Sequence, residues 1–211
     1  MLRRVLVSVV ALLGVMGAGL ATTGVANAST PPGGGNGKVL NVVWQRESYN
    51  YWCGPAATRI ALSARMGSGL PSQATLAGQL GTTTAGTDNV GLVTGVLNRD
   101  LHTSWYETKW MRNDPPTGAQ VNLLWSDITY DVDHGYALVV NIDAPASNHP
   151  PGYPNYEILH YFTVAGYEPG TDNVYIVDPA SGLPGFGAVP QHYWLSLGKL
   201  ASLVPPKGYS A

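Results

Sequence analysis

The sequence is short of cysteine, of charged residues and of runs of like charge. A single Cys among 211 residues excludes an internal disulfide. Charged residues make up 11%, and the formal net charge is -2, so neither a nucleic-acid-binding patch nor a polybasic membrane anchor is indicated. The hydrophobic content of 45% argues against a disordered chain. A chain of this length buries a sizeable core in about one domain, without disulfides or metals.

The sequence also lacks an N-terminal apolar run long enough for a permanent membrane anchor. Residues 5–20 are apolar and uncharged, which is short for the roughly 20 residues that span a bilayer. Arg3 and Arg4 precede this run, and the small-residue triplet Ala26-Asn27-Ala28 follows it, as is typical of a secretory signal peptide. We therefore expect residues 1–28 to be cleaved, which predicts a secreted protein without stable membrane insertion.

Two segments remain after the predicted cleavage. Residues 29–38 are rich in Pro and Gly and are predicted to form a linker. Residues 39–211 are predicted to form the folded domain. In an oxidising compartment an unpaired thiol is usually avoided, so Cys53 is either a small buried core residue or a functional one.

Cys53 stands where a helix is predicted to begin. Apolar residues recur with helical spacing after it, and Gly67 ends the pattern. Pro55 suits a first helical turn, because the N–H that proline lacks would have no partner there. The helix N-terminus carries partial positive charge, which favours a thiolate over a thiol. This placement makes Cys53 a candidate nucleophile.

The remaining pattern changes from helical to β-like near residue 136. A short β-like segment is predicted at 39–44 before the first helix. Further helices are predicted at 72–80, 89–101 with Asp88 or Thr87 as N-cap, and 121–132. Strands are predicted at 136–142, 160–167 and 173–177, with a turn at 168–172 and a surface flap at 144–156. Helices followed by antiparallel strands indicate an α+β domain with N-terminal helices packed on an antiparallel sheet.

One of the five histidines is placed to act as the base for a cysteine nucleophile. His160 begins a buried strand, and its predicted hairpin partner ends in Asp178-Pro179. The two ends of an antiparallel hairpin lie together, so the Asp178 carboxylate is expected to orient the His160 imidazole. The other four have ordinary surface or capping interpretations: His102, His134, His149 and His192.

An acyl-transfer site also needs donors for the oxyanion. The backbone N–H of Cys53 can provide one, and the side-chain amide of Gln45 can provide a second. Cysteine and histidine lack the close paired spacing of a structural zinc site, and no phosphate-binding loop is found, so neither a metal nor a cofactor is expected.

These residues resemble family thirty-nine of the papain-like cysteine peptidases, the bacteriocin leader-peptidase-like group. The resemblance rests on Gln45, on residues 53–57 opening a helix, on residues 160–164 and on residues 177–179, and covers about residues 39–204. It implies a papain-like fold in a bacterial hydrolase with Cys53 as nucleophile, His160 as general base and acid, Asp178 as orienting carboxylate and Gln45 as oxyanion donor. The spacing between Gln45 and Cys53 is longer than is usual in the family. The transporter-linked removal of leader peptides is not expected.

The residues and the resemblance predict one main function and leave two alternatives open. The main prediction is a secreted peptidase or amidase that hydrolyses a peptide-type bond in a peptide or protein substrate through a thioester. One alternative is an acyltransferase of transglutaminase or phytochelatin-synthase type. Another is a non-catalytic module that binds peptide or glycan through aromatic loops. Its contact residues would be Tyr49, Tyr51, Trp52, Tyr153 and Tyr156. The sequence leaves the substrate and the oligomeric state open.

Overall fold

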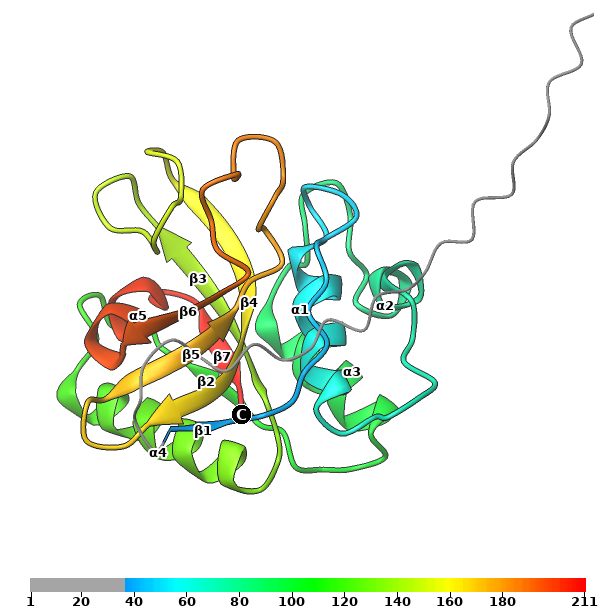
Figure 1. The fold of residues 1–211 in the computed structure, drawn as a ribbon, viewed down its shortest axis with the longest axis horizontal. Helices are drawn as coiled ribbons and strands as arrows, with labels where there is room; N and C mark the ends of the chain where they lie inside the picture. Colours follow the sequence, from blue (N-terminus) through cyan, green and yellow to red (C-terminus); the bar gives the residue numbers. More distant parts are fainter. Residues whose placement is uncertain (1–36) are drawn as a thin grey trace, which may run out of the picture.

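The computed structural model describes residues 37–211 as an antiparallel sheet with helices on both faces (Figure 1). The sheet runs in the order β2-β7-β3-β4-β5-β6, and β1 pairs with β4 off this path. The strands are β1 (Lys38–Val39), β2 (Thr108–Trp110), β3 (Leu138–Ala144), β4 (Ile158–Glu168), β5 (Asn173–Val177), β6 (His192–Ser196) and β7 (Gly208–Ser210). The predicted signal peptide, residues 1–28, lies outside the described residues.

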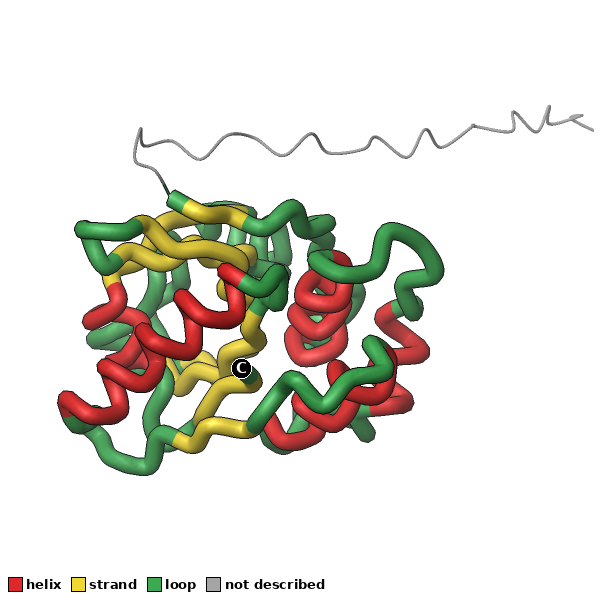
Figure 2. The backbone as a smooth tube through the Cα atoms, turned by 90° about the horizontal axis from the view of Figure 1, so that it is seen from below, coloured by secondary structure: helices red, strands yellow, loops and turns green. Residues whose placement is uncertain are grey.

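The helices divide between the two faces of the sheet, as Figures 1 and 2 show. They are α1 (Cys53–Ser63), α2 (Gln73–Gln79), α3 (Val90–Asp100), α4 (Gly118–Asp133) and α5 (Leu197–Leu203). Helices α1 to α3 cover one face, and α4 and α5 cover the other. Between residues 37 and 211, no helix has both the length and the apolar character that crossing a membrane requires.

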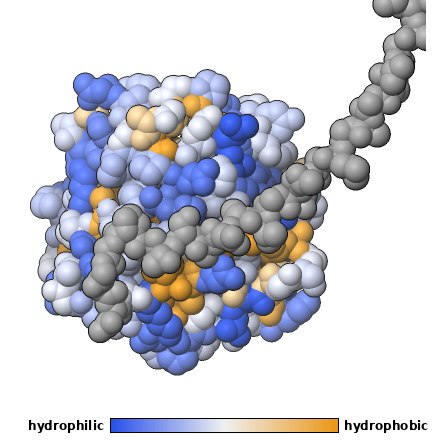
Figure 3. Space-filling model, in the orientation of Figure 1, coloured by the Kyte–Doolittle hydropathy of each residue, from blue (hydrophilic) through white to orange (hydrophobic). Residues whose placement is uncertain are grey.

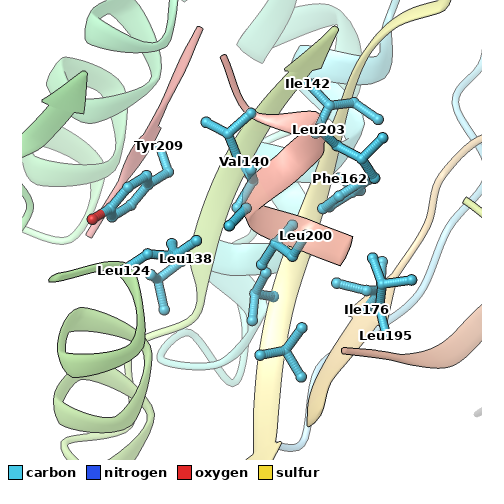
Figure 4. Packing of buried hydrophobic residues seen from close by; sticks show 14 of the residues in the cluster. Leu124, Leu138, Val140, Ile142, Phe162, Ile176, Leu195, Leu200, Leu203 and Tyr209 are labelled. Atoms are coloured by element: carbon cyan, nitrogen blue, oxygen red, sulfur yellow. The ribbon is translucent and has the colours of Figure 1, made fainter. Parts of the chain in front are cut away.

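Each face of the sheet has its own hydrophobic core. Phe162 and Val164 of β4 pack into the cluster beneath α4 and α5. Figure 4 shows part of this cluster, with Phe162 labelled. Tyr161 and Ala165, on the opposite face of the same strand, pack into the cluster beneath α1 to α3. A strand buried on both faces reads as a continuous apolar run, as β4 does. The side of the molecule visible in Figure 3 is mostly hydrophilic, with its hydrophobic colouring in separate small areas.

Most of the predicted long elements are confirmed, including the hairpin of β4 and β5. The N-cap of α3 is Asn89, whose side chain accepts from Gly91 N, so the predicted Asp88 or Thr87 is wrong by one or two residues. The predicted linker runs one residue too far, because Lys38 already pairs with Tyr167 in β1.

The β-like segment predicted at 39–44 is wrong beyond Val39. The Leu40 N–H still donates to the Ala165 carbonyl of β4 at 2.8 Å, after which the chain leaves the sheet, and the Trp44 indole donates to the backbone carbonyl of Asp178 at 2.8 Å. Four short elements were not predicted: β2, β6, α5 and β7. They have three to seven residues, which is too short for a clear periodic signal.

Candidate active site

Cys53 is the first residue of α1 and is 8% exposed. The N-cap residue, Trp52, makes no side-chain hydrogen bond to the helix start. The first N–H groups of a helix have no intrahelical acceptor, so the amides beside the thiol are unoccupied by a side-chain cap. They form a partial positive charge next to the sulfur.

A glycine follows the thiol because the loop after α2 packs directly against the helix start. A Cβ atom on Gly54 would lie 2.2 Å from the Thr87 hydroxyl oxygen. Thr87 is held in turn by Thr82 through a hydroxyl contact of 2.7 Å. The Cys-Gly sequence therefore lets this loop close over the start of α1.

A buried hydrogen bond joins α1 to the strand that carries the histidine. The Thr163 hydroxyl of β4 donates to the backbone carbonyl of Ala57 in α1 at 2.9 Å. Both residues are fully buried. This bond fixes the helix that begins with Cys53 against the strand that contains His160.

His160 lies in β4, is 4% exposed and contacts Asp178. Its Nε2 atom is 3.0 Å from Asp178 Oδ1. The hairpin geometry predicted from the sequence therefore brings these two side chains together. Because Nε2 is engaged with the carboxylate, Nδ1 is the ring nitrogen left for the Cys53 sulfur.

Asp178 follows β5 and is completely buried, yet both of its carboxylate oxygens are well paired. Besides His160, Oδ1 accepts from the Ala180 amide at 2.9 Å. Oδ2 accepts from the hydroxyls of Tyr153 at 2.6 Å and Tyr193 at 2.9 Å. These four donors fix the carboxylate and stabilise its charge.

The ionisation of this pair follows from its surroundings. Burial disfavours the charged imidazole, but the Asp178 carboxylate and the Cys53 sulfur outweigh it and hold the pKa of His160 well above its ordinary value. Burial also opposes the charged carboxylate, but His160, Tyr153 and the Ala180 amide keep the pKa of Asp178 below its ordinary value. Both shifts favour an imidazolium paired with a carboxylate beside the Cys53 sulfur.

Cys53 and His160 line one cleft of about 300 Å³. The buried residues at its base are Glu47, Cys53, Ile158, His160 and Ala180. The other lining residues are Asn50, Tyr156, Glu157, Leu159, Leu183, Pro184 and Phe186. The cleft therefore opens the thiol and the imidazole to a ligand from the same side.

Gln45 is held in place by a second glutamine at the start of α2. Gln73 Nε2 donates to Gln45 Oε1 at 2.8 Å and to the Arg46 carbonyl at 2.9 Å. Gln45 Nε2 is buried, and no hydrogen-bond partner for it lies within residues 37–211. The amide thus has its oxygen fixed and its donor free.

Three residues of the site differ from the sequence prediction or were not part of it: Tyr153, Tyr193 and Glu47. Tyr153, predicted to be an aromatic contact residue of a surface flap, is instead 5% exposed and bonds to Asp178. Tyr193 and Glu47 were not predicted as site residues. The hydroxyl of Tyr193 comes from β6, and a β-strand tyrosine alone gives no signal of its partner. Glu47 lies two residues after Gln45, in a loop whose burial the sequence does not reveal.

The remaining histidines do not line the cleft. His134 caps the C-terminus of α4, and His192 stacks on Tyr175 at 5.8 Å between ring centroids. His102 follows the end of α3 with a φ of 52°. His149 contacts the carbonyl of Pro150.

Comparison with known proteins gives a matching family model and similar solved structures. The model of the Peptidase_C39 like family matches residues 39–202. The peptidase domain of Streptococcus ComA, a bi-functional ABC transporter involved in a quorum sensing pathway, is similar at 18% identity, with a TM-score of 0.48, over 80% of this chain and 96% of that one. No curated protein matches. Because the family model covers most of the chain, the chain belongs to the Peptidase_C39 like family and is a cysteine peptidase-like hydrolase with an α+β papain-like fold.

Proposed function

We propose that this protein hydrolyses a peptide-type amide bond through a thioester on Cys53. The observation that carries the proposal is the buried His160–Asp178 pair, with an Nε2 to Oδ1 distance of 3.0 Å, in the same cleft as a thiol at a helix start. A thiolate, an imidazolium and a carboxylate in that order supply the nucleophile, the acid and the orienting group.

In the first half of the reaction, the Cys53 sulfur attacks the carbonyl carbon, and a C–S bond forms. The carbonyl oxygen becomes an oxyanion that accepts from the Cys53 N–H and from Gln45 Nε2. Collapse of this intermediate breaks the C–N bond. His160 gives its proton to the leaving nitrogen, so an amine departs and a thioester remains.

In the second half, His160 accepts a proton from water as the water oxygen attacks the thioester carbon. The C–S bond breaks, the acid product leaves, and the proton stays on His160, which restores the thiolate–imidazolium pair. Asp178 keeps the imidazole in one orientation through both halves. No step requires a metal or an organic cofactor.

The substrate that we propose is a peptide or protein outside the cytoplasm. We propose that residues 1–28 direct export and are removed after Ala28. The mass of the protein recovered from the medium of an expressing bacterium tests this, and a mass that retains residues 1–28 would contradict it.

The test of the activity uses Cys53→Ala beside the wild type. Peptide, isopeptide and peptidoglycan-fragment libraries are incubated with each, with and without an added amine acceptor. We expect wild-type cleavage to fall by at least about 10⁴-fold in a variant that keeps its circular dichroism spectrum. Full cleavage by the variant would contradict the proposal. Acceptor-dependent products in place of hydrolysis would favour an acyltransferase.

A further inference from the structure

Glu47 is a buried acidic residue at the base of the cleft that the proposed reaction does not use. Its side chain is 3% exposed, and it lines the cleft with Cys53 and His160. Its Oε2 atom has no hydrogen-bond partner among the described residues. Burying a polar atom without a partner costs stability, so a ligand atom that pairs with it removes this cost.

The backbone around Glu47 is fixed on two sides. The Glu47 N–H donates to the carbonyl of Pro179 at 3.0 Å, next to the orienting carboxylate. The following N–H, of Ser48, donates to the side-chain oxygen of Gln73 at 2.9 Å. These contacts hold the backbone that carries Glu47, while its Oε2 atom remains without a partner among residues 37–211.

The charges that line the cleft favour a cationic ligand. Glu47 and Glu157 are both acidic, and no Lys or Arg within residues 37–211 lines the cleft. Among the described residues, His160 is the basic group that lines the cleft, and the Asp178 carboxylate balances its charge. Burial raises the pKa of Glu47 from 4.5 to about 7, with His160 and the Trp52 backbone opposing the rise and Asp178 adding to it. A positive charge placed beside Glu47 would restore its ionised form.

The rim of the cleft offers apolar contacts to the same ligand. Tyr156 is 53% exposed and Leu159 is 60% exposed, and both line the cleft. Long cationic side chains combine an apolar stem with a charged end, so they match an apolar rim above an acidic base.

We propose that Glu47 determines substrate specificity by binding an ammonium or guanidinium group of the acyl donor, while the scissile carbonyl lies at Cys53. The proposal rests on the proposed function, because it names the substrate class of the same cleft. An N–H of the cationic group donates to Oε2 of Glu47. Tyr156 and Leu159 cover the apolar stem.

The first test measures how fast Cys53 is alkylated by small reagents that differ in charge. The probes are 2-bromoethylammonium, iodoacetamide and iodoacetate, each normalised to its rate with N-acetylcysteinamide at pH 8. In each reaction the sulfur forms a bond to carbon, and the halide leaves with the electron pair of the broken C–halogen bond. For wild type we expect the normalised rate of the cationic reagent to exceed that of the anionic one by about tenfold, the effect of roughly 1.4 kcal/mol.

Three variants sharpen this test. Glu47→Gln keeps the shape but loses the charge, and we expect the preference for the cation to disappear. Glu157→Gln removes an exposed charge at the same cleft, and Asp131→Asn removes a carboxylate that is 4% exposed and lines a different cavity. Both are expected to keep most of the preference.

The outcomes separate the two proposals. If Cys53 is alkylated rapidly but without a charge preference, or if Glu157→Gln removes the preference as fully as Glu47→Gln, the role of Glu47 is overturned while the proposed hydrolysis stands. If Cys53 reacts with iodoacetamide at pH 5.5 no faster than N-acetylcysteinamide does, the proposed hydrolysis itself fails.

The second test uses peptide libraries randomised on both sides of the cleaved bond. We expect wild type to enrich Lys and Arg at one position, and Glu47→Gln to lose that enrichment through an increase in KM of about tenfold for the cationic peptides. Matched peptides with norleucine in place of Lys should show nearly equal KM values in the two proteins. Enrichment of Asp or Glu by wild type would overturn the proposal.

Discussion

Two parts of the site differ in how many hydrogen bonds their buried polar atoms make: the sheet side around Asp178 and the loop side around residues 45–47. On the sheet side, Asp178 accepts four hydrogen bonds, from His160, Ala180, Tyr153 and Tyr193. On the loop side, Glu47 Oε2, which lines the cleft, and Gln45 Nε2, whose residue does not line it, are buried without a partner inside residues 37–211. A saturated network holds a group in one orientation, whereas an unfilled one leaves a place for a ligand atom. In the proposed function, the sheet side orients the base, and the loop side is where we propose that the substrate binds.

The largest expected effect is on the sheet side, in Asp178→Asn. The new side-chain amide has no charge to balance the imidazolium of His160. Its NH2 group also faces one of the four groups that donate to the Asp178 carboxylate in wild type. The His160 ring therefore loses both its charge partner and its orientation. We expect cleavage to fall by about 10⁴-fold, as for the loss of an orienting carboxylate in other triads. A variant that folds and retains more than about a tenth of wild-type cleavage would remove the distinction between the two sides.

On the loop side, Gln45→Ala should have the next largest effect. It removes a free donor without disturbing the His160–Asp178 pair, so kcat is expected to fall by about 10²-fold to 10³-fold with little change in KM. The rate of Cys53 alkylation by iodoacetamide should remain close to wild type. An equal fall in the alkylation rate would show that Gln45 acts on the thiol rather than on the oxyanion.

Tyr153→Phe tests how much the orientation of the Asp178 carboxylate depends on all four of its hydrogen-bond donors. It removes the hydroxyl that donates to Asp178 Oδ2 at 2.6 Å and leaves that of Tyr193 in place. We expect a loss of stability of about 2 kcal/mol, because a hydrogen bond to a charged group is removed from a buried site. Cleavage should fall by about tenfold or less. Denaturant unfolding and kcat measured on the same sample check both values.

The smallest effect on cleavage of neutral substrates is expected for Glu47→Gln, which should instead change stability. Burial raises the pKa of Glu47 to about 7, so this carboxyl favours folding most at pH values below 4.5 and loses that contribution as the pH rises through 7. The Glu47→Gln variant has no ionisable group at this position, so it does not lose this stability as the pH rises. We expect it to be more stable than wild type by up to about 3 kcal/mol at pH 8 and nearly equal to wild type at pH 4.

Denaturant unfolding at several pH values checks this prediction, with Asp131→Asn as the comparison. Burial raises the pKa of Asp131 to about 6, which the Trp105 side-chain hydrogen bond partly offsets, so its variant should gain less and at lower pH. A Glu47→Gln protein that is less stable than wild type at pH 8 would mean that the carboxylate has an internal partner.

The sequence predicted the sheet side of the site better than the loop side. His160 lies in β4, and Asp178 directly follows β5, the next strand across a short turn, so local pairing rules place them together. Cys53 was found because the helix that it begins has a clear apolar period and a first-turn proline.

The donors to Asp178 could not be predicted from local patterns. Tyr153 lies in a loop of Pro, Asn and Gly residues, and Tyr193 lies in a five-residue strand that was not predicted. Their hydroxyls meet the carboxylate only through the folding of distant segments. The same holds for Glu47, whose burial depends on contacts of its backbone with Pro179 and of Ser48 with Gln73.

The measurement that tests the central claim most directly is the rate of Cys53 alkylation by iodoacetamide at pH 5.5, compared with N-acetylcysteinamide. An ordinary thiol is only about 0.1% thiolate at this pH. If the His160–Asp178 pair supplies an imidazolium beside the sulfur, Cys53 should react at least about tenfold faster than the free thiol, and Asp178→Asn should abolish that advantage. A wild-type rate no faster than that of the free thiol would contradict the account.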